Sequence, residues 1–118
     1  MGAYLTISAY TASQNNPVEI SKGDPLIVGQ EYKGNPNWVG WIKCTHILTG
    51  KESWVPKQLI KIFKHEAVAL SDYSAKELTV GKGIRVEIQK QMNGWSWCRT
   101  ESGEEGWLPD DAIGFSNK

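Results

Sequence analysis

The chain has 118 residues, of which 40% are hydrophobic and 22% are charged, and its formal net charge at pH 7 is zero. A neutral chain is poorly suited to binding nucleic acid through its phosphates, and no apolar run approaches the roughly 18 to 20 residues that span a bilayer. Since the N-terminus shows no signal-peptide pattern, we expect a cytoplasmic protein that binds neither nucleic acid nor membranes.

The first half of the chain predicts short strands joined by turns. The expected strands begin at Tyr4 and cover Pro25–Val28, Trp41–Cys44 and Trp54–Pro56, which are rich in aromatic or β-branched residues. Thr49–Lys51 is a predicted hairpin turn, in which glycine supplies a positive φ. The segments after Pro56 and, in the second half, after Pro109 each allow one short 3₁₀ turn before a last strand.

The second half shows the same succession. Ile84–Ile88 alternates apolar and polar residues, as a half-buried strand does. Trp95–Cys98 and the segment ending in Pro109 are further expected strands, and Glu101–Glu104 is a hairpin turn. Because no stretch has a sustained helical period, the expected fold class is all-β.

The two halves form a sequence repeat, in which uncommon residues recur in the same order. The matched residues are Tyr10 and Tyr73, Lys22-Gly23 and Lys82-Gly83, Trp41 and Trp95, Cys44 and Cys98, Trp54-Val55-Pro56 and Trp107-Leu108-Pro109, and Ile60 and Ile113. Insertions fall between these blocks, where loops are expected. The repeat predicts one domain at residues 1–62 and a second at residues 63–118.

The linker between the repeats, Lys61–His65, is short and contains no Gly, Pro or Ser. So short a connection should keep the two domains in contact. We therefore expect a monomer whose domains pack together in a nearly fixed arrangement.

At the matched residues the chain resembles the Src-homology-3 family, in its variant, bacterial-type branch. In the second repeat, Ala69–Tyr73 resembles the family's Ala-Leu-Tyr-Asp-Tyr, Glu77–Gly83 its Glu-Leu-Ser-Phe-Lys-Lys-Gly, Asn93–Trp97 its Gly-Trp-Trp, and Gly106–Pro109 its Gly-Tyr-Ile-Pro. The first repeat matches through Tyr10, Pro17–Asp24, Gly40-Trp41 and Trp54–Pro56. The resemblance covers nearly the whole chain and implies two tandem five-stranded barrels. Family members bind extended, Pro-rich peptides on a groove of aromatic rings.

The resemblance also implies which residues line each groove. These are Tyr73, Trp95 and Pro109 in the second repeat, and Tyr10, Trp41 and Pro56 in the first. Two further ring positions of the family hold Ser71 and Ala112 in the second repeat, and Ser8 and Leu59 in the first. Both repeats therefore carry only part of the family's groove.

Acidic residues and further tryptophans accompany these grooves. Asp72, Glu77, Asp110 and Asp111 are either solvated turn charges or an anionic rim around Trp95 that favours Lys or Arg in a ligand. Trp41 and Trp95, each after a glycine, are expected to be exposed ligand contacts. Trp38, in the long loop of the first repeat, either caps a domain interface or enlarges a groove. Trp54 and Trp107 are expected to pack within the domains, and Trp97 to be a packing residue or an interface residue.

The remaining residues with reactive side chains do not suggest a catalytic or metal centre. Cys44 and Cys98 are expected to be small buried residues, too far apart for a disulfide, and His46 and His65 to be surface residues. No spacing suggests a metal site, a phosphate loop or a nucleophile with its base. We expect no metal, no cofactor and no enzymatic activity.

The leading hypothesis from the sequence is a protein- or peptide-binding module whose ligand is Pro-rich or basic. Exposed aromatic residues would also suit a cell-wall (peptidoglycan) ligand. A third hypothesis is a structural or assembly protein, in which the aromatic residues pack the two domains together.

Overall fold

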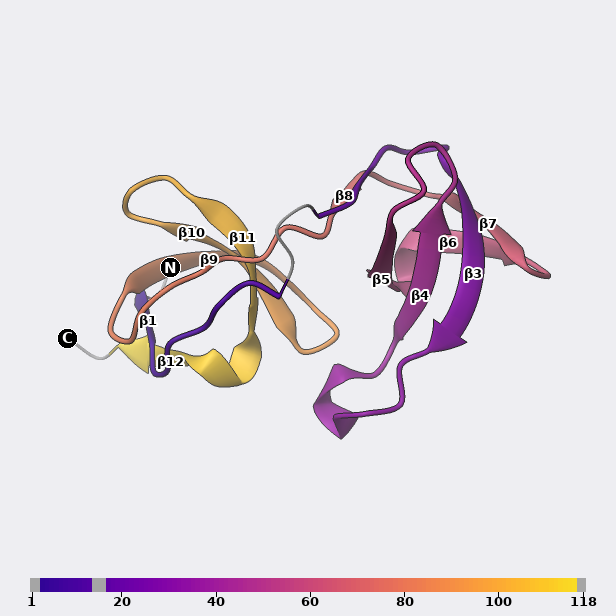
Figure 1. Cartoon of the computed structure of the whole chain (residues 1–118). Helices are drawn as coiled ribbons and strands as arrows, with labels where there is room; N and C mark the ends of the chain where they lie inside the picture. The colour runs from indigo at the N-terminus through magenta and orange to yellow at the C-terminus, as the bar shows by residue number, and fades with distance from the viewer. Residues whose placement is uncertain (1–2, 14–16, 117–118) are drawn as a thin grey trace. The chain divides into compact units, whose positions relative to one another are not determined.

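The computed structural model describes residues 3–13 and 17–116, which form an all-β protein with two five-stranded sheets and one two-stranded sheet (Figure 1). The strands are β1 (Ala3–Thr6), β2 (Glu19–Ile20), β3 (Pro25–Glu31), β4 (Trp41–His46), β5 (Glu52–Pro56), β6 (Ile60–Phe63), β7 (Glu66–Ala69), β8 (Tyr73–Ser74), β9 (Arg85–Met92), β10 (Trp95–Thr100), β11 (Glu105–Pro109) and β12 (Ile113–Ser116). The expected all-β class is confirmed.

The helical segments are single 3₁₀ turns. They are η1 (Pro36–Trp38), η2 (Lys57–Leu59) and η3 (Asp110–Ala112). The 3₁₀ turns predicted after the two prolines are confirmed by η2 and η3. In the described part of the chain, no helix is long and apolar enough to cross a membrane.

The strands assemble into two compact units that are not the two halves of the sequence. Unit 1 comprises residues 1–15 and 76–118, and unit 2 comprises residues 16–75. Unit 1 holds the sheet β11-β10-β9-β1-β12, and unit 2 holds β5-β4-β3-β7-β6 together with the pair β2-β8. The predicted domains, residues 1–62 and 63–118, therefore differ from the observed units. Among the described residues, the end strands of neither five-stranded sheet pair to close a barrel.

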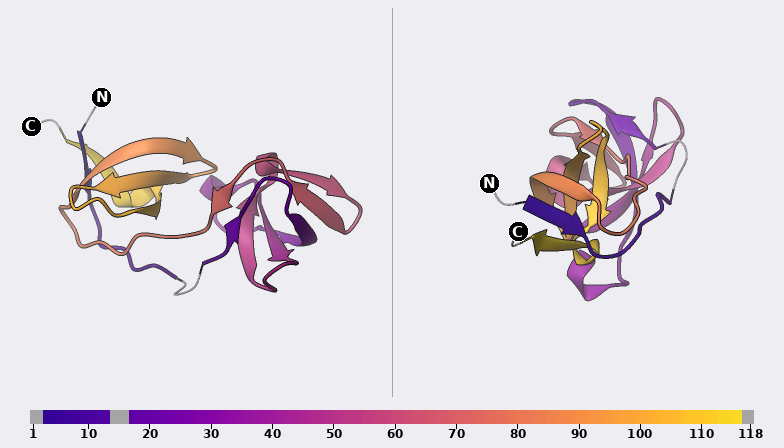
Figure 2. Two further views of the ribbon diagram at one scale, coloured as in Figure 1. Left: turned by 90° about the horizontal axis from the view of Figure 1, so that it is seen from above. Right: turned by 90° about the vertical axis from the view of Figure 1, so that its left-hand side faces the viewer.

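The first strand of each repeat lies in the sheet formed by the other repeat. Strand β1 of the first repeat lies between β9 and β12 of the second, and β7 of the second repeat lies between β3 and β6 of the first. The right-hand view of Figure 2 shows the indigo β1 between an orange and a yellow strand. The protein is thus a strand-exchanged tandem repeat.

The two exchanged strands occupy equivalent places, with the same register. In unit 1, Thr6 pairs with Ile113 and Tyr4 with Val86. The equivalent pairs in unit 2 are Ala69 with Ile60 and Ala67 with Leu26. Backbone hydrogen bonds follow the same rule, because the N–H groups of Thr6 and Ala69 donate to the equivalent carbonyls of Ile84 and Asp24 at 2.9 and 3.0 Å. The two first strands therefore make equivalent backbone pairs. These pairs alone would not favour the exchanged arrangement over one in which each strand stays in its own repeat.

The connection between the repeats accounts for the exchange. Phe63 pairs with Glu66, which leaves only Lys64 and His65 in the turn between β6 and β7, and Lys64 has a φ of 60°. Antiparallel strands joined by so tight a turn pair with each other. Strand β7 is therefore held beside the last strand of the first repeat, and the equivalent place in unit 1 is filled by β1.

The exchanged segment also completes the core of unit 1. Its buried cluster consists of Leu78, Val86, Cys98 and Leu108, and Tyr4 and Tyr10 of the exchanged segment pack against it. Both cysteines are buried free thiols, as expected. Burial raises the pKa of the Cys44 thiol to about 11, and burial together with the charge of Asp110 raises that of Cys98 to about 12.

Lengthening the connection between the repeats should allow β1 and β7 to return to the sheets of their own repeats. We expect an insertion of about eight Gly and Ser residues between Lys64 and His65, long enough to free β7 from β6, to give a mixture of arrangements. Nuclear Overhauser contacts report it, because Tyr4 lies beside Val86 in the exchanged form and would lie beside Leu26 in the unexchanged one. The same insertion after Ser102 is the control and should preserve the contact between Tyr4 and Val86. If that contact alone persists in both variants, the turn does not cause the exchange.

Candidate functional site

The strand exchange regroups the residues predicted to line the two grooves. Tyr10 lies in unit 1, with Glu77, Trp95 and Pro109 of the second repeat. The residues that unit 2 brings together are Trp38, Trp41 and Pro56 with Asp72 and Tyr73. The predicted groupings, Tyr73 with Trp95 and Tyr10 with Trp41, are therefore replaced by their exchanged counterparts. The physical reason is the tight β6–β7 turn, which carries Tyr73 into unit 2.

Tyr10 and Trp95 form a half-buried aromatic pair on unit 1. Their ring centroids lie 5.8 Å apart with an interplanar angle of 82°, an edge-to-face arrangement. Two backbone hydrogen bonds between Tyr10 and Val80, of 2.9 and 2.8 Å, hold Tyr10 in place.

The position of Trp95 is set by the turn before it. Asn93 and Gly94 have φ values of 54° and 88°, which allows a two-residue turn from β9 into β10. Trp95 follows at once and pairs across the sheet with the buried Pro109. The aromatic pair and this proline are the part of the predicted groove that unit 1 assembles.

The Glu77 carboxylate binds the exchanged segment beside this pair. One oxygen, Oε1, accepts the Tyr10 hydroxyl at 2.9 Å, the Ser13 N–H at 2.7 Å and the Ser13 hydroxyl at 2.9 Å. Burial, followed by the charge and hydrogen bond of Glu77, raises the pKa of Tyr10 well above its ordinary value. Tyr10 therefore remains a neutral hydrogen-bond donor, and the carboxylate beside it has a fixed orientation.

A glycine on β11 allows the Glu77 segment to lie against the sheet. The Trp107 N–H donates to the Lys76 carbonyl at 2.9 Å, and the Leu78 N–H donates to the Trp107 carbonyl at 3.1 Å. A Cβ on the neighbouring Gly106 would lie 2.9 Å from the Leu78 nitrogen and 3.0 Å from the Glu77 carbonyl carbon. Only glycine fits at this close approach between backbones.

The other three acidic residues of the predicted rim have different partners. Asp110 accepts the buried Ser96 hydroxyl at 2.5 Å, and its own N–H donates to Gly94 at 2.9 Å. Asp111 is exposed. Asp72 lies in unit 2, where its carboxylate accepts the Lys22 N–H at 2.8 Å. Of the predicted anionic rim, Glu77 contacts the aromatic pair directly, through its hydrogen bond with the Tyr10 hydroxyl.

The corresponding residues of unit 2 are buried. Trp41 and Tyr73 are each only 7% exposed, and Pro56 is fully buried. The Tyr73 hydroxyl donates to the Trp54 carbonyl at 3.2 Å. The prediction that Trp41 is exposed is therefore wrong. Its backbone lies between β5 and the returning loop, whose Tyr32 N–H donates to the Trp41 carbonyl at 2.8 Å.

Unit 2 instead carries an aromatic cluster centred on Tyr32. The Tyr32 ring lies 5.4 Å from Trp54, edge to face, and 6.1 Å from the half-buried Trp38. The Tyr32 hydroxyl accepts the Asn35 N–H at 3.1 Å, and Lys43 lies over the Trp54 ring at 5.6 Å. Sequence reasoning missed Tyr32. The sequence feature that could have pointed to Tyr32 is its position in the long loop that carries Trp38. The second repeat has no loop of this length.

The tryptophans expected to pack within the domains do so to different degrees. Trp107 is buried, whereas Trp54 and Trp97 are half-buried. Trp97 and Trp107 pair across β10 and β11 with their rings 5.4 Å apart, edge to face.

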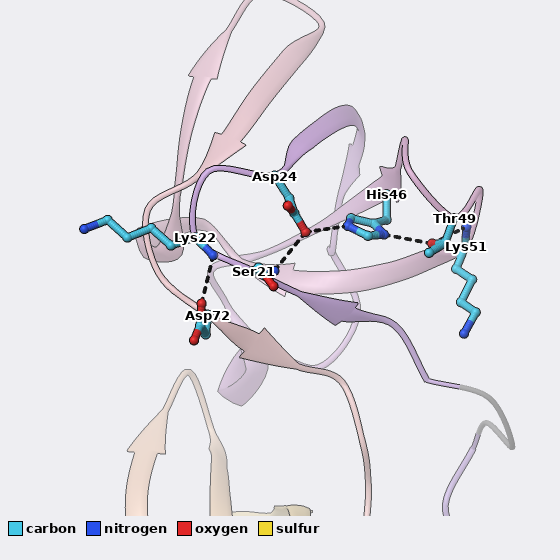
Figure 3. Close-up of polar contacts among 7 residues, drawn as sticks. All are labelled: Ser21, Lys22, Asp24, His46, Thr49, Lys51 and Asp72. Atoms are coloured by element: carbon cyan, nitrogen blue, oxygen red, sulfur yellow. Dashed lines mark hydrogen bonds and ion pairs between the residues drawn. The ribbon is translucent and has the colours of Figure 1, made fainter.

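His46 lies at the centre of a polar group in unit 2, so its predicted surface position is wrong. Its ring is 4% exposed, with Nε2 at 2.8 Å from the Asp24 carboxylate and Nδ1 at 2.8 Å from the Thr49 hydroxyl. Figure 3 shows the Asp24 carboxylate between this ring and the Ser21 backbone, whose N–H donates to it at 2.9 Å. Hydrogen bonds on both ring nitrogens offset the cost of burying the imidazole. His65, in the β6–β7 turn, is exposed as expected.

A carboxylate, an imidazole and a hydroxyl in this order are also the components of a hydrolase triad. The burial of His46, however, leaves little room for a substrate at the imidazole. The Thr49 hydroxyl also accepts the Lys51 N–H at 3.4 Å, within its own turn. We interpret the group as a structural link between the turn at Ser21–Asp24 and the β4–β5 turn.

No family model, no curated protein and no solved structure matches the chain. Among the residues that the structure describes, no group of three or more His, Cys, Asp or Glu side chains is placed to hold a metal ion. A functional assignment must therefore be argued from the side chains of the two units.

Substituting Gly106 should disturb the Glu77 segment. We expect Gly106→Ala to destabilise the protein by about 1–3 kcal/mol, because the new methyl group meets backbone atoms that cannot move independently. The matched control is Gly81→Ala, where a Cβ would meet nothing within 4 Å and the change should stay within about 0.5 kcal/mol. Urea denaturation measures both, and equal stabilities for the two variants would contradict the close approach.

The Asp24 carboxylate should stabilise unit 2 in a pH-dependent way. Hydrogen bonds, first from the Ser21 N–H and then from His46, lower the pKa of Asp24 in the folded protein. Its contribution is therefore present above the unfolded pKa of about 3.9 and is lost as the pH falls through the folded value.

We expect Asp24→Asn to be less stable than the parent chain at pH 6 to 7, with the difference shrinking as the pH is lowered towards about 2. Chemical denaturation over this pH series is the measurement. The exposed carboxyl of Asp111 provides the control, because Asp111→Asn should change stability little at any pH. A pH-independent deficit in Asp24→Asn would contradict the assigned role of the carboxylate.

Proposed function

We propose that the protein is a non-catalytic binding module of tandem Src-homology-3 type, and that unit 1 binds an extended protein or peptide segment. The observation that carries the proposal is the half-buried Tyr10–Trp95 pair beside the oriented Glu77 carboxylate. Two all-β units of equivalent strand order, with the buried Pro109 paired to Trp95 at the family's groove-proline position, also support the Src-homology-3 assignment.

The geometry of the aromatic pair favours a proline-containing ligand. The Tyr10 and Trp95 ring planes are nearly perpendicular, so their partly exposed parts form an angled apolar surface. A polyproline II segment is stiff before binding and loses little conformational entropy when its rings pack on aromatic side chains. This surface therefore suits a short Pro-rich segment.

The Glu77 carboxylate favours a Lys or Arg in the same ligand. Its orientation is already set by Tyr10 and Ser13, so a cation can pair with it without ordering a mobile side chain. A charge-assisted hydrogen bond of this kind fixes the ligand's direction as well as adding affinity.

We assign binding to unit 1 because the equivalent residues of unit 2 are covered. Trp41 and Tyr73 are buried, whereas Trp95 and Tyr10 are half-exposed. In unit 2 the half-buried aromatic residues Trp38 and Tyr32 lie in the long loop, which is not one of the positions matched between the repeats.

The test is an amide NMR titration with a Pro-rich peptide that contains Lys or Arg. We expect shift changes around Trp95, Tyr10 and Glu77, and a Kd at least tenfold higher for Trp95→Ala, which corresponds to about 1.4 kcal/mol. Trp38→Ala is the matched control, since it removes a half-buried tryptophan from the other unit and should leave the Kd unchanged. Glu77→Gln, which keeps hydrogen-bond acceptance, should weaken only peptides that carry the basic residue.

Two outcomes would overturn the proposal. One is no shift in unit 1 with any Pro-rich peptide. The other is a response to muropeptide fragments alone, which would favour a cell-wall ligand instead.

A further inference from the structure

We propose that the N-terminal arm, residues 3–13, can leave unit 1 of its own chain and enter unit 1 of a second molecule. The product is a strand-exchanged dimer in which each Tyr10–Trp95 surface is built from two chains. This inference goes beyond the proposed peptide-binding function and does not rest on it.

The described contacts of the arm are made with the second repeat. Strand β1 pairs with β9 and β12. The Thr6 hydroxyl donates to the Gly81 carbonyl at 2.7 Å and accepts the Ile84 N–H at 2.8 Å. Tyr10 and Ser13 bind Glu77. These contacts involve only the arm and the part of unit 1 that belongs to the second repeat, which we call the acceptor. An arm from a second molecule can therefore make every one of them.

The acceptor cannot complete its sheet with the strand of its own repeat. The β6–β7 turn holds Glu66–Ala69 in unit 2, so an arm is the donor that remains for the place between β9 and β12. When an arm leaves, Val86 and Leu108 of the core cluster lose the covering Tyr4 and Tyr10. Two molecules in this state restore their buried apolar surface by exchanging arms.

The chain already shows that its opening strands are interchangeable. The arm and the equivalent segment of the second repeat sit in the two units with the same register and the same backbone hydrogen bonds. Exchange between molecules extends this arrangement and keeps the pairing of each strand. Domain swapping of this kind is a low-cost route to a dimer, because the native contacts are retained.

Chain concentration should decide between the two forms. A tethered arm competes at an effective concentration of the order of millimolar, so the closed monomer prevails in dilute solution. Refolding at about 1 mM should instead give a substantial fraction of dimer.

The position of β1 provides a specific cross-link for the test. Leu5 pairs with Arg85, and the neighbouring Thr6 N–H donates to Ile84, so Leu5 and Arg85 form a non-hydrogen-bonded pair. Cα atoms in such pairs lie about 4.5 Å apart, within the range of a disulfide. Arg85 is exposed, so its substitution leaves the core intact.

The experiment mixes two full-length chains, Leu5→Cys and Arg85→Cys, that are unfolded in urea with a thiol reductant and refolded together while still reduced. The reductant is removed and the oxidant is added only after refolding, when Cys44 and Cys98 are buried. Non-reducing electrophoresis and light scattering after gel filtration measure the mixed disulfide and the mass. We expect the mixed dimer to rise at least tenfold between refolding at about 10 µM and about 1 mM. The native Cys44 and Cys98 are buried and common to all samples.

Two controls separate arm exchange from random contact. Arg99→Cys places a thiol at an exposed position of β10 that does not pair with β1, so its mixture with Leu5→Cys should yield little disulfide. The double variant Leu5→Cys/Arg85→Cys, oxidised when dilute, locks the arm in its own chain and should stay monomeric at about 1 mM. The proposal is overturned if the Arg85→Cys mixture gives no more mixed disulfide than the Arg99→Cys mixture, or if the locked chain dimerises as readily as the parent.

Discussion

The tight turn between β6 and β7 is the constraint on which the arrangement of the whole chain depends. With only Lys64 and His65 between paired strands, the last strand of the first repeat and the first strand of the second must lie side by side. Unit 2 therefore takes its opening strand from the second repeat, and unit 1 is completed by the N-terminal arm. The β6–β7 turn, which connects the two repeats, thus determines which strands each unit contains.

The candidate binding surface is a consequence of the same constraint. Tyr10 arrives on the exchanged arm, whereas Trp95 and Glu77 belong to the repeat that receives it. The Glu77 carboxylate holds the arm through Tyr10 and Ser13, and it also places a negative charge of fixed orientation beside the aromatic rings. The proposed binding at this surface would therefore depend on the arm being held in unit 1.

The two units share a strand framework and differ in their loops. Unit 1 keeps a short Asn93-Gly94 turn and a half-exposed Trp95. Unit 2 has a longer loop organised by Tyr32 and a buried Asp24–His46 pair that links two turns. Strand order and register are the same in both units, because these are set by backbone pairing, whereas the loops and polar groups differ.

The sequence by itself determined the all-β class, the repeat, the 3₁₀ turns after Pro56 and Pro109 and the burial of both cysteines, because each depends on local residue preferences. It also gave Tyr10, Trp95, Pro109 and Glu77 as candidate site residues. Only the tertiary structure decided that Tyr10 meets Trp95 and that Trp41 and His46 are buried. The opening strands of the two repeats fit either unit with the same register, so the choice between them lies in long-range pairing, which a pattern of neighbouring residues does not contain.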